Sequence, residues 1–206
     1  MESNKALFLD RDGIINVDYG YVGTLEKFKL IEGIIELCSE AISAGYKIYI
    51  ITNQAGIAKN KFTLNQFLEL TKYIINLFSE RGIDINVYFC PYHSEAIDQN
   101  YILNHKIQHD YFNCLSDYNI SNNIFLSDYR KPSPGMILQA QKRFNLNLKE
   151  SIFIGDQKTD MLAANLAGLS KAVLVNKEAI NITDDYRFVK KLPTFNELLK
   201  LINFKL

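Results

Sequence analysis

Short, continuously apolar segments recur along this chain, and amphipathic segments with helical spacing separate them. Strands are predicted over 5–10, 46–52, 85–90, 151–156 and 171–175. Helices are predicted over 33–45, 64–81, 134–144, from 157 to about Gly168, and over 194–203, with Ser133 as the N-cap of the third. Unbroken runs of Ile, Leu, Val and Phe are typical of parallel strands buried on both faces. The pattern therefore predicts an α/β fold, a Rossmann-like parallel sheet with helices on both faces.

The chain has 206 residues, enough for one sizeable core, so we expect one domain over 1–206 with a polar, Asn/Tyr-rich insertion at about 91–123. Its formal net charge is zero, which argues against nucleic acid or an anionic membrane as partner. The chain has no apolar run of membrane-span length and no signal-peptide pattern at its start. Its three cysteines form no even disulfide framework. We expect a cytoplasmic monomer.

Polar residues stand at the ends of the predicted strands. Asp10, Thr52 and Asp156 each end one of them, and Lys131 stands just before a predicted helix. Because parallel sheets place their sites at the carboxyl ends of the strands, we expect these side chains to converge. Asp10 and Asp12 are one residue apart, and such a pair repels unless a cation lies beside it.

These residue types together suit phosphate chemistry. An oxygen-rich site fits Mg²⁺ better than a soft metal, and a hydroxyl with an ammonium complements a phosphoryl group. One carboxylate can attack phosphorus while a second donates and accepts the proton. The alternative for each aspartate taken alone is a turn former or a helix cap.

Four segments resemble, in order, the motifs of the haloacid dehalogenase superfamily of phosphotransferases: "FLDRDGIIN", "ITNQAGIAKNKF", "RKPSPGM" and "IGDQKTD". The resemblance covers about residues 6 to 176. It implies that Asp10 is the nucleophile and Asp12 the general acid/base. It further implies that Thr52 and Lys131 are ligands of the phosphoryl group. A carboxylate at position 12 also sets the chain apart from members that cleave carbon–halogen bonds.

The same resemblance implies a magnesium site. Asp10, Asp156 and the backbone carbonyl of Asp12 would hold the Mg²⁺ ion, and Asp160 would orient this shell from behind. The insertion is too short for a cap domain, so we expect an open site.

The details of these motifs resemble the branch of histidinol-phosphate phosphatases and D-glycero-D-manno-heptose 1,7-bisphosphate phosphatases. The run "NVDYGYV" (16–22) resembles the substrate loop of the heptose enzymes. The resemblance implies a substrate site made of Asp18, Tyr19, Gly20, Tyr21, Thr52, Asn53, Gln54, Ala55, Arg130, Lys131 and Gln157. The expected substrate is a small phosphorylated sugar, heptose 1,7-bisphosphate, which would lose its 7-phosphate.

Several other functions stay open at this point. One is the hydrolysis of histidinol phosphate or of another small phosphosugar. A second is a polynucleotide 3′-phosphatase, against which the lack of a basic stripe argues. A third is a catalytically silent phosphosugar-binding module, for which an intact acid/base would have no use.

This chain departs from the branch in a structural zinc loop. It keeps Cys90, but other residues stand where the remaining ligands are usually found: Tyr92, Ser127 and Tyr129. We therefore expect no zinc. A rewired site remains the alternative, with ligands drawn from Cys90, His93, His105, His109 and Cys114.

Two smaller departures concern single residues. Asn60 stands where relatives often have glycine, and we expect a left-handed backbone there, which Asn tolerates. Gln157 stands where relatives often have lysine, which removes one positive charge beside the phosphate.

Overall fold

The computed structural model describes residues 4–94, 128–175 and 189–192, the last stretch as backbone only. The predicted helix 194–203 and most of the predicted insertion at 91–123 lie outside these residues. Within the described ranges, no helix has the length and apolar character needed to cross a membrane.

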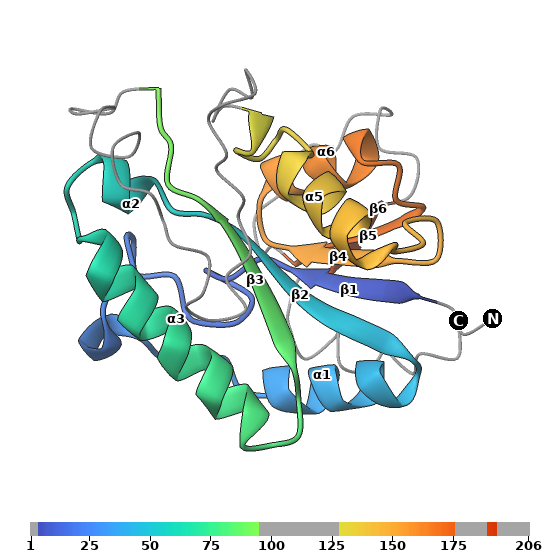
Figure 1. Ribbon diagram of the computed structural model, residues 1–206, viewed down its shortest axis with the longest axis horizontal. Helices are drawn as coiled ribbons and strands as arrows, with labels where there is room; N and C mark the ends of the chain where they lie inside the picture. The colour runs from blue at the N-terminus through green and yellow to red at the C-terminus, as the bar shows by residue number, and fades with distance from the viewer. Residues whose placement is uncertain (1–3, 95–127, 176–188, 193–206) are drawn as a thin grey trace.

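A parallel sheet forms the centre of the fold (Figure 1). Its strands are β1 (Lys5–Leu9), β2 (Tyr46–Asn53), β3 (Ile85–Cys90), β4 (Ile152–Gly155), β5 (Lys171–Val175) and β6 (Val189–Leu192). They lie in the order β3-β2-β1-β4-β5-β6 and all pair in parallel. In register, Leu7 of β1 is the partner of Ile48 in β2 and of Ile152 in β4. The strand β6 was not among the predicted strands.

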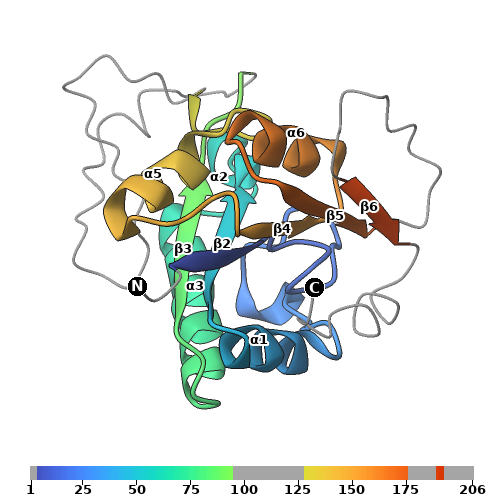
Figure 2. The same ribbon diagram turned by 90° about the vertical axis from the view of Figure 1, so that its right-hand side faces the viewer.

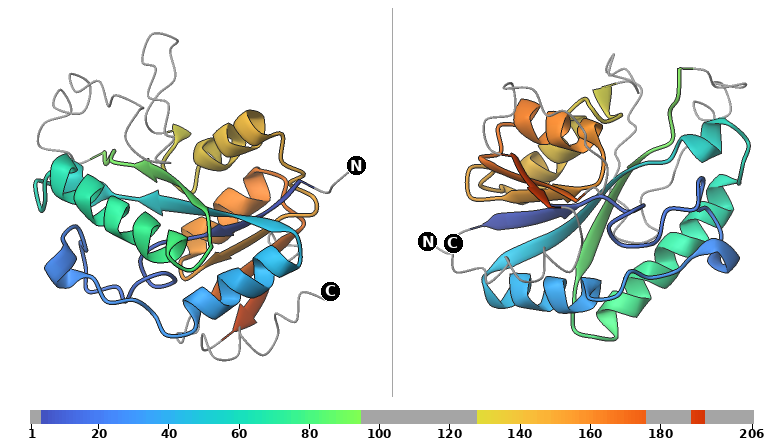
Figure 3. Two further views of the ribbon diagram at one scale, coloured as in Figure 1. Left: turned by 60° about the horizontal axis from the view of Figure 1, so that its bottom comes forward. Right: turned by 180° about the vertical axis from the view of Figure 1, so that it is seen from behind.

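Helices cover both faces of the sheet, as predicted. The helices α1 (Ile34–Ser43) and α3 (Leu64–Ser79) lie on one face, and α5 (Gly135–Phe144) and α6 (Lys158–Leu166) lie on the other (Figure 2). Both views in Figure 3 show the same separation. A short helix, α2 (Ala55–Ala58), lies between β2 and α3, where no helix was predicted.

The two helical layers enclose two hydrophobic cores. Along β1, Leu7 and Leu9 belong to the core under α1 and α3, whereas Ala6 and Phe8 belong to the core under α5 and α6. Each fully buried large apolar side chain contributes roughly 1.5–3 kcal/mol. Because successive strand residues face opposite sides and both sides are covered, the strand sequence is continuously apolar.

Local signals explain where some of the helices begin. At α3, Thr63 and Gln66 form a capping box: Gln66 N donates to Thr63 Oγ1 at 3.2 Å, and Thr63 N donates to Gln66 Oε1 at 2.8 Å. The predicted N-cap of α5 is wrong, since that cap is Pro134 and not Ser133. Ser133 N instead donates to Arg130 O at 2.8 Å, so a tight turn occupies the chain up to Pro134 and delays the helix.

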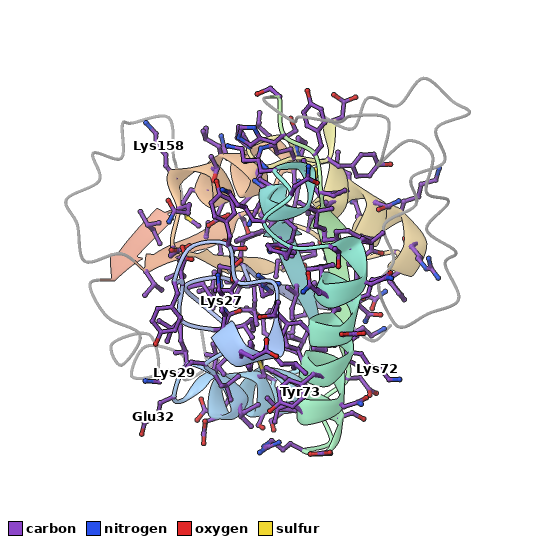
Figure 4. All side chains as sticks on the ribbon, turned by 90° about the vertical axis from the view of Figure 1, so that its left-hand side faces the viewer. Lys27, Lys29, Glu32, Lys72, Tyr73 and Lys158 are labelled. Carbon is purple, nitrogen blue, oxygen red and sulfur yellow. The ribbon has the colours of Figure 1, made fainter. Side chains whose placement is uncertain are left out.

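A 3₁₀ turn, η1 (Leu25–Lys27), lies between β1 and α1 in the sequence and packs against α3. The rings of Phe28 and Tyr73 meet edge to face with 5.8 Å between their centroids. Figure 4 labels Tyr73 on α3 and Lys27, the residue of η1 that precedes Phe28. The contact holds the long β1–α1 connection against α3.

Candidate active site

A cavity of about 310 Å³ lies beyond the carboxyl ends of β1, β2 and β4. Most of the predicted site residues line it: Asp10, Asp12, Asp18, Gly20, Tyr21, Asn53, Gln54, Ala55, Arg130, Lys131, Asp156, Gln157 and Asp160. The predicted convergence of strand ends therefore matches the observed placement of these side chains.

Two predicted site residues lie outside the cavity wall. The Tyr19 side chain is 59% exposed, and Thr52 is only 1% exposed. Thr52 Oγ1 accepts a hydrogen bond from Gln54 Nε2 at 2.8 Å, so its hydroxyl lies behind Gln54. Three other residues line the cavity but were not predicted: Gly56, Phe62 and Thr159. Each of them belongs to a quoted motif, which is the signal that could have found them.

Lys131 lies at the centre of the site with its ammonium group fully engaged. Its Nζ lies 2.8 Å from Ile51 O, 2.8 Å from Asp10 Oδ1 and 2.6 Å from Asp160 Oδ1. Burial by itself lowers the pKa of Lys131, but the charges of the two carboxylates outweigh it and the pKa is raised. Lys131 therefore stays a cation.

Asn53, the last residue of β2, positions the backbone of Lys131. Its Nδ2 donates to Lys131 O and its Oδ1 accepts from Lys131 N, both at 3.0 Å. One amide side chain thus pairs with both backbone groups of Lys131 and fixes the loop before α5 at the end of the sheet.

Carboxylate oxygens of Asp10, Asp156 and Asp160 lie within 4.8 Å of one another. Burial, followed by the charge of Asp160, raises the pKa of Asp10 well above its usual range. The same two causes raise the pKa of Asp156 to about 7. A single lysine cannot neutralise three carboxylates, so this group fits an additional divalent cation, and its oxygen donors suit Mg²⁺.

Gly13 allows the loop after β1 to approach this group closely. Its φ is +84°, and a Cβ atom placed there would lie 2.6 Å from Cγ of Asp156. A side chain at position 13 would therefore meet both an unfavourable backbone conformation and the Asp156 carboxyl group. The backbone next to Asp12 consequently lies beside Asp156. The expected Mg²⁺ site would use the carbonyl of Asp12 together with this carboxyl group.

Asp12 is held separately from the three clustered carboxylates. Its oxygens accept from Arg11 Nη2 at 2.8 Å, from Asn16 Nδ2 at 2.9 Å and from Gln54 Nε2 at 3.1 Å. The site thus contains two kinds of carboxylate. Asp10 belongs to the cluster that suits a divalent cation, and Asp12 lies at the cavity wall with its own hydrogen-bond partners.

Comparison with known proteins identifies the family. The sequence model of the polynucleotide kinase 3 phosphatase family matches residues 15–192. The D-glycero-beta-D-manno-heptose-1,7-bisphosphate 7-phosphatase of Photorhabdus laumondii is 38% identical over 171 residues, which cover 82% of this chain and 79% of that protein. The chain belongs to the heptose-bisphosphate phosphatase family. It is a phosphatase of the haloacid dehalogenase-like type, as its motifs predict.

Other relatives of this phosphatase differ in the anomer that they are named for. The D-glycero-alpha-D-manno-heptose-1,7-bisphosphate 7-phosphatase of Burkholderia mallei is 39% identical over 173 residues, covering 84% of this chain and 80% of that one. The solved D,D-heptose 1,7-bisphosphate phosphatase of B. bronchiseptica, complexed with magnesium and phosphate, is 18% identical. It covers 95% of this chain and 96% of its own with a TM-score of 0.69, so the two share a fold.

The predicted substrate loop of this phosphatase reaches the cavity with part of its residues. Asp18 Oδ1 accepts from Gly20 N at 2.8 Å, which closes a tight turn. Tyr21 then adopts a positive φ of 52°, and its ring lies 6.0 Å from the ammonium of Lys61. This turn brings Asp18, Gly20 and Tyr21 to the cavity wall and leaves Tyr19 in solvent.

Phe62 packs between Gly23, the residue after the substrate loop, and Gly56 in α2. A Cβ atom at Gly23 or at Gly56 would overlap the Phe62 ring, so the ring sits directly against two glycine backbones. Phe62 is buried, with 6% of its surface exposed. The chain turns back toward this position through Asn60, whose φ of 52° confirms the expected left-handed conformation.

Arg130 also lines the cavity, and its Nη1 donates to Tyr92 O at 3.1 Å. The neighbouring Cys90 is buried, and burial raises the pKa of its thiol to about 12. The other residues named for a rewired zinc site, except His93, lie outside the described part of the chain: His105, His109 and Cys114.

Proposed function

We propose that this phosphatase removes the 7-phosphate of D-glycero-D-manno-heptose 1,7-bisphosphate through an aspartyl-phosphate intermediate, with Mg²⁺ as cofactor. The observation that carries the proposal is the arrangement of Asp10 and Asp12 around one cavity. The first is fixed by Lys131 next to a cation-binding group, and the second is held at the wall by uncharged and charged donors. Relatives at 38% and 39% identity are named for this substrate.

In the first step, Asp10 attacks phosphorus. Its Oδ1 accepts from Arg11 N at 2.7 Å and from Lys131 Nζ at 2.8 Å, which leaves Oδ2 outside these contacts as the attacking atom. A new bond forms between Oδ2 and phosphorus. The bond from phosphorus to the sugar oxygen breaks, its electron pair stays on that oxygen, and Asp12 donates a proton to it.

In the second step, water attacks the phosphorus of the aspartyl phosphate. Asp12, now ionised, takes a proton from that water as the new bond forms. The bond from phosphorus to Asp10 breaks and its electron pair returns to the carboxylate. Inorganic phosphate leaves, Asp10 is again a carboxylate, and Asp12 is again protonated.

Asp10, Asp156 and the backbone carbonyl of Asp12 would hold the Mg²⁺ ion. A bound ion supplies positive charge that offsets the clustered carboxylates and the phosphoryl oxygens. Asp160 supports this group from behind, because it is fully buried and contacts the ammonium of Lys131.

The remaining cavity residues would contact the rest of the substrate. Arg130 suits bidentate contact with the distal phosphate, while Asp18 and Tyr21 offer hydrogen-bond partners for sugar hydroxyls. We assign the substrate site to the predicted residues that line the cavity, and leave out Tyr19. Thr52 would act through Gln54, which covers its hydroxyl.

Phosphate release from the purified protein tests the proposal. Both anomers of heptose 1,7-bisphosphate are compared with histidinol phosphate, with Mg²⁺ and with EDTA, and Asp10→Asn serves as control. A preference for one bisphosphate anomer that requires Mg²⁺ and is lost in the variant supports substrate and mechanism. Activity only on histidinol phosphate would refute the substrate, and full activity of the variant would refute the nucleophile.

A further inference from the structure

Arg11 is a buried cation between the two aspartates of the site. Only 1% of its surface is exposed, although charged side chains are rarely buried unless they are paired. Arg11 belongs to the first motif, yet it does not line the cavity, and its side chain has no part in the steps described above.

Its guanidinium group donates hydrogen bonds to both carboxyl oxygens of Asp12. Nη2 lies 2.8 Å from both Asp12 oxygens, and Nε lies 3.2 Å from Oδ1. Contacts from two nitrogens of one planar group restrain both the position and the plane of a carboxylate. Asn16 and Gln54 complete the cradle, one at each oxygen. The side chain of Asp12 keeps 23% of its surface exposed, on the side of the cavity.

The same guanidinium group also contacts the substrate loop. Nη2 donates to the carbonyl oxygen of Val22, the residue after Tyr21. On its other side, the guanidinium carbon lies 5.6 Å from the ring centroid of Phe67 in α3. Arg11 therefore connects Asp12 to the loop that lines the cavity, and α3 supports it from behind.

We propose that Arg11 is a positioning residue that holds Asp12 where the substrate's leaving oxygen arrives and couples this position to the substrate loop. The inference rests on the proposed function, in which Asp12 donates the proton. Without Arg11, the carboxyl group keeps one amide contact at each oxygen and loses its planar restraint and its link to Val22. Proton donation suffers, whereas attack by Asp10, which Lys131 aligns, does not.

This difference can be measured with two leaving groups. The sugar oxygen at the 7-position is a poor leaving group and needs a proton, whereas p-nitrophenolate leaves without one. The parameter to compare is kcat/KM, which covers only the steps up to departure of the leaving group. Because general acid catalysis contributes about 10²–10⁴-fold, Arg11→Met should lower kcat/KM for the bisphosphate by about 100-fold or more. The loss for p-nitrophenyl phosphate should stay below about 10-fold.

Matched variants separate positioning from a merely structural role. Arg81→Met removes an exposed arginine that follows α3 and whose Nη1 donates to Leu77 O of that helix at 2.7 Å, and it should change neither rate. Arg11→Lys keeps the buried charge without the planar group, so it should fold and show an intermediate loss with the same leaving-group pattern. In an Asp12→Asn background, Arg11→Met should cost little more, since both changes remove one function.

A crystal structure of Arg11→Lys gives a readout that does not depend on turnover. Displacement of the Asp12 carboxyl group from its place beside Asn16 and Gln54 is expected. Equal losses for both leaving groups, or an Asp12 that keeps its place, would overturn the inference. If the wild type releases no phosphate from either compound, the proposed function fails, and the crystal structure still decides whether Arg11 positions Asp12.

Discussion

Replacing Lys131 with methionine should reveal how strongly the site depends on one buried ammonium group. Methionine is close to lysine in length and fills the same space without a charge. The change removes three contacts of 2.6–2.8 Å, to Asp10, Asp160 and the carbonyl of Ile51. It leaves two buried carboxylates facing each other with no cation between them. Breaking a buried ion pair in this way costs about 3–5 kcal/mol.

Urea unfolding in EDTA, followed by circular dichroism, measures this cost. With a slope of about 2 kcal/mol per molar urea, the midpoint should fall by roughly 1.5–2.5 M. The loss should depend on pH. Without Lys131 the pKa of Asp10, already raised, rises further, and a group with a raised folded-state pKa loses stabilising effect as pH increases through that pKa. The deficit of the variant should therefore be larger at pH 8 than at pH 5.

A second substitution tests the assigned cause. Lys131→Met combined with Asp160→Asn should be more stable than Lys131→Met alone, because one of the unpaired charges is gone. A loss below about 1 kcal/mol at pH 7.5, or a loss that is the same at both pH values, would refute the reasoning. Either result would mean that the two carboxylates do not depend on the ammonium for their charge balance.

Three further predictions concern other parts of the site. Gly13→Ala should lower kcat/KM by about 100-fold, because the new side chain displaces Asp156. The control is Gly168→Ala, which has a nearly equal φ of +85° and no atom within 4 Å of its Cβ, so it should lose about 1 kcal/mol of stability and keep its activity. Equal activity of the two variants would contradict this prediction. In EDTA, raising the pH from 5 to 7.5 should destabilise the wild type, because folding raises the pKa of Asp156 from 3.8 to about 7 and ionising its buried carboxyl group then costs stability. Asp156→Asn should flatten that slope in urea titrations, and an unchanged slope would count against the raised pKa. Phe62→Ala should lose about 3–5 kcal/mol in thermal unfolding and raise KM, and a purely destabilised enzyme with an unaltered KM would separate Phe62 from substrate binding.

Much of the fold follows from the sequence because its signals are local. Unbroken apolar strands and amphipathic helices determine a doubly covered parallel sheet, and the sheet in turn brings Asp10 and Asp156 to one edge. The strand β6 was missed because "VKKL" (189–192) lacks an apolar run. The helix α2 was missed because a single turn is too short for periodicity to indicate.

The finer structure of the site depends on contacts between segments that are distant in sequence. No local pattern predicts that Lys131 engages the carbonyl of Ile51, or that Arg11 turns inward. Thr52 was expected at the phosphate from the resemblance of its motif and from its place at the end of the predicted strand. In the structure β2 continues to Asn53, and the next residue, Gln54, covers the hydroxyl. A shift of one residue at a strand end decides which side chain faces the cavity.

The contact of Phe62 with Gly23 and Gly56 has a consequence for changing the specificity of this enzyme. The ring leaves no room for a side chain at either glycine, so the chain at the end of the substrate loop and the α2 segment both pack directly against Phe62. A foreign loop grafted over 17–23 alone would need to reproduce that surface by chance. Grafts should succeed when 17–23 and 54–62 are exchanged together from one donor, so the two segments have to change together when specificity changes.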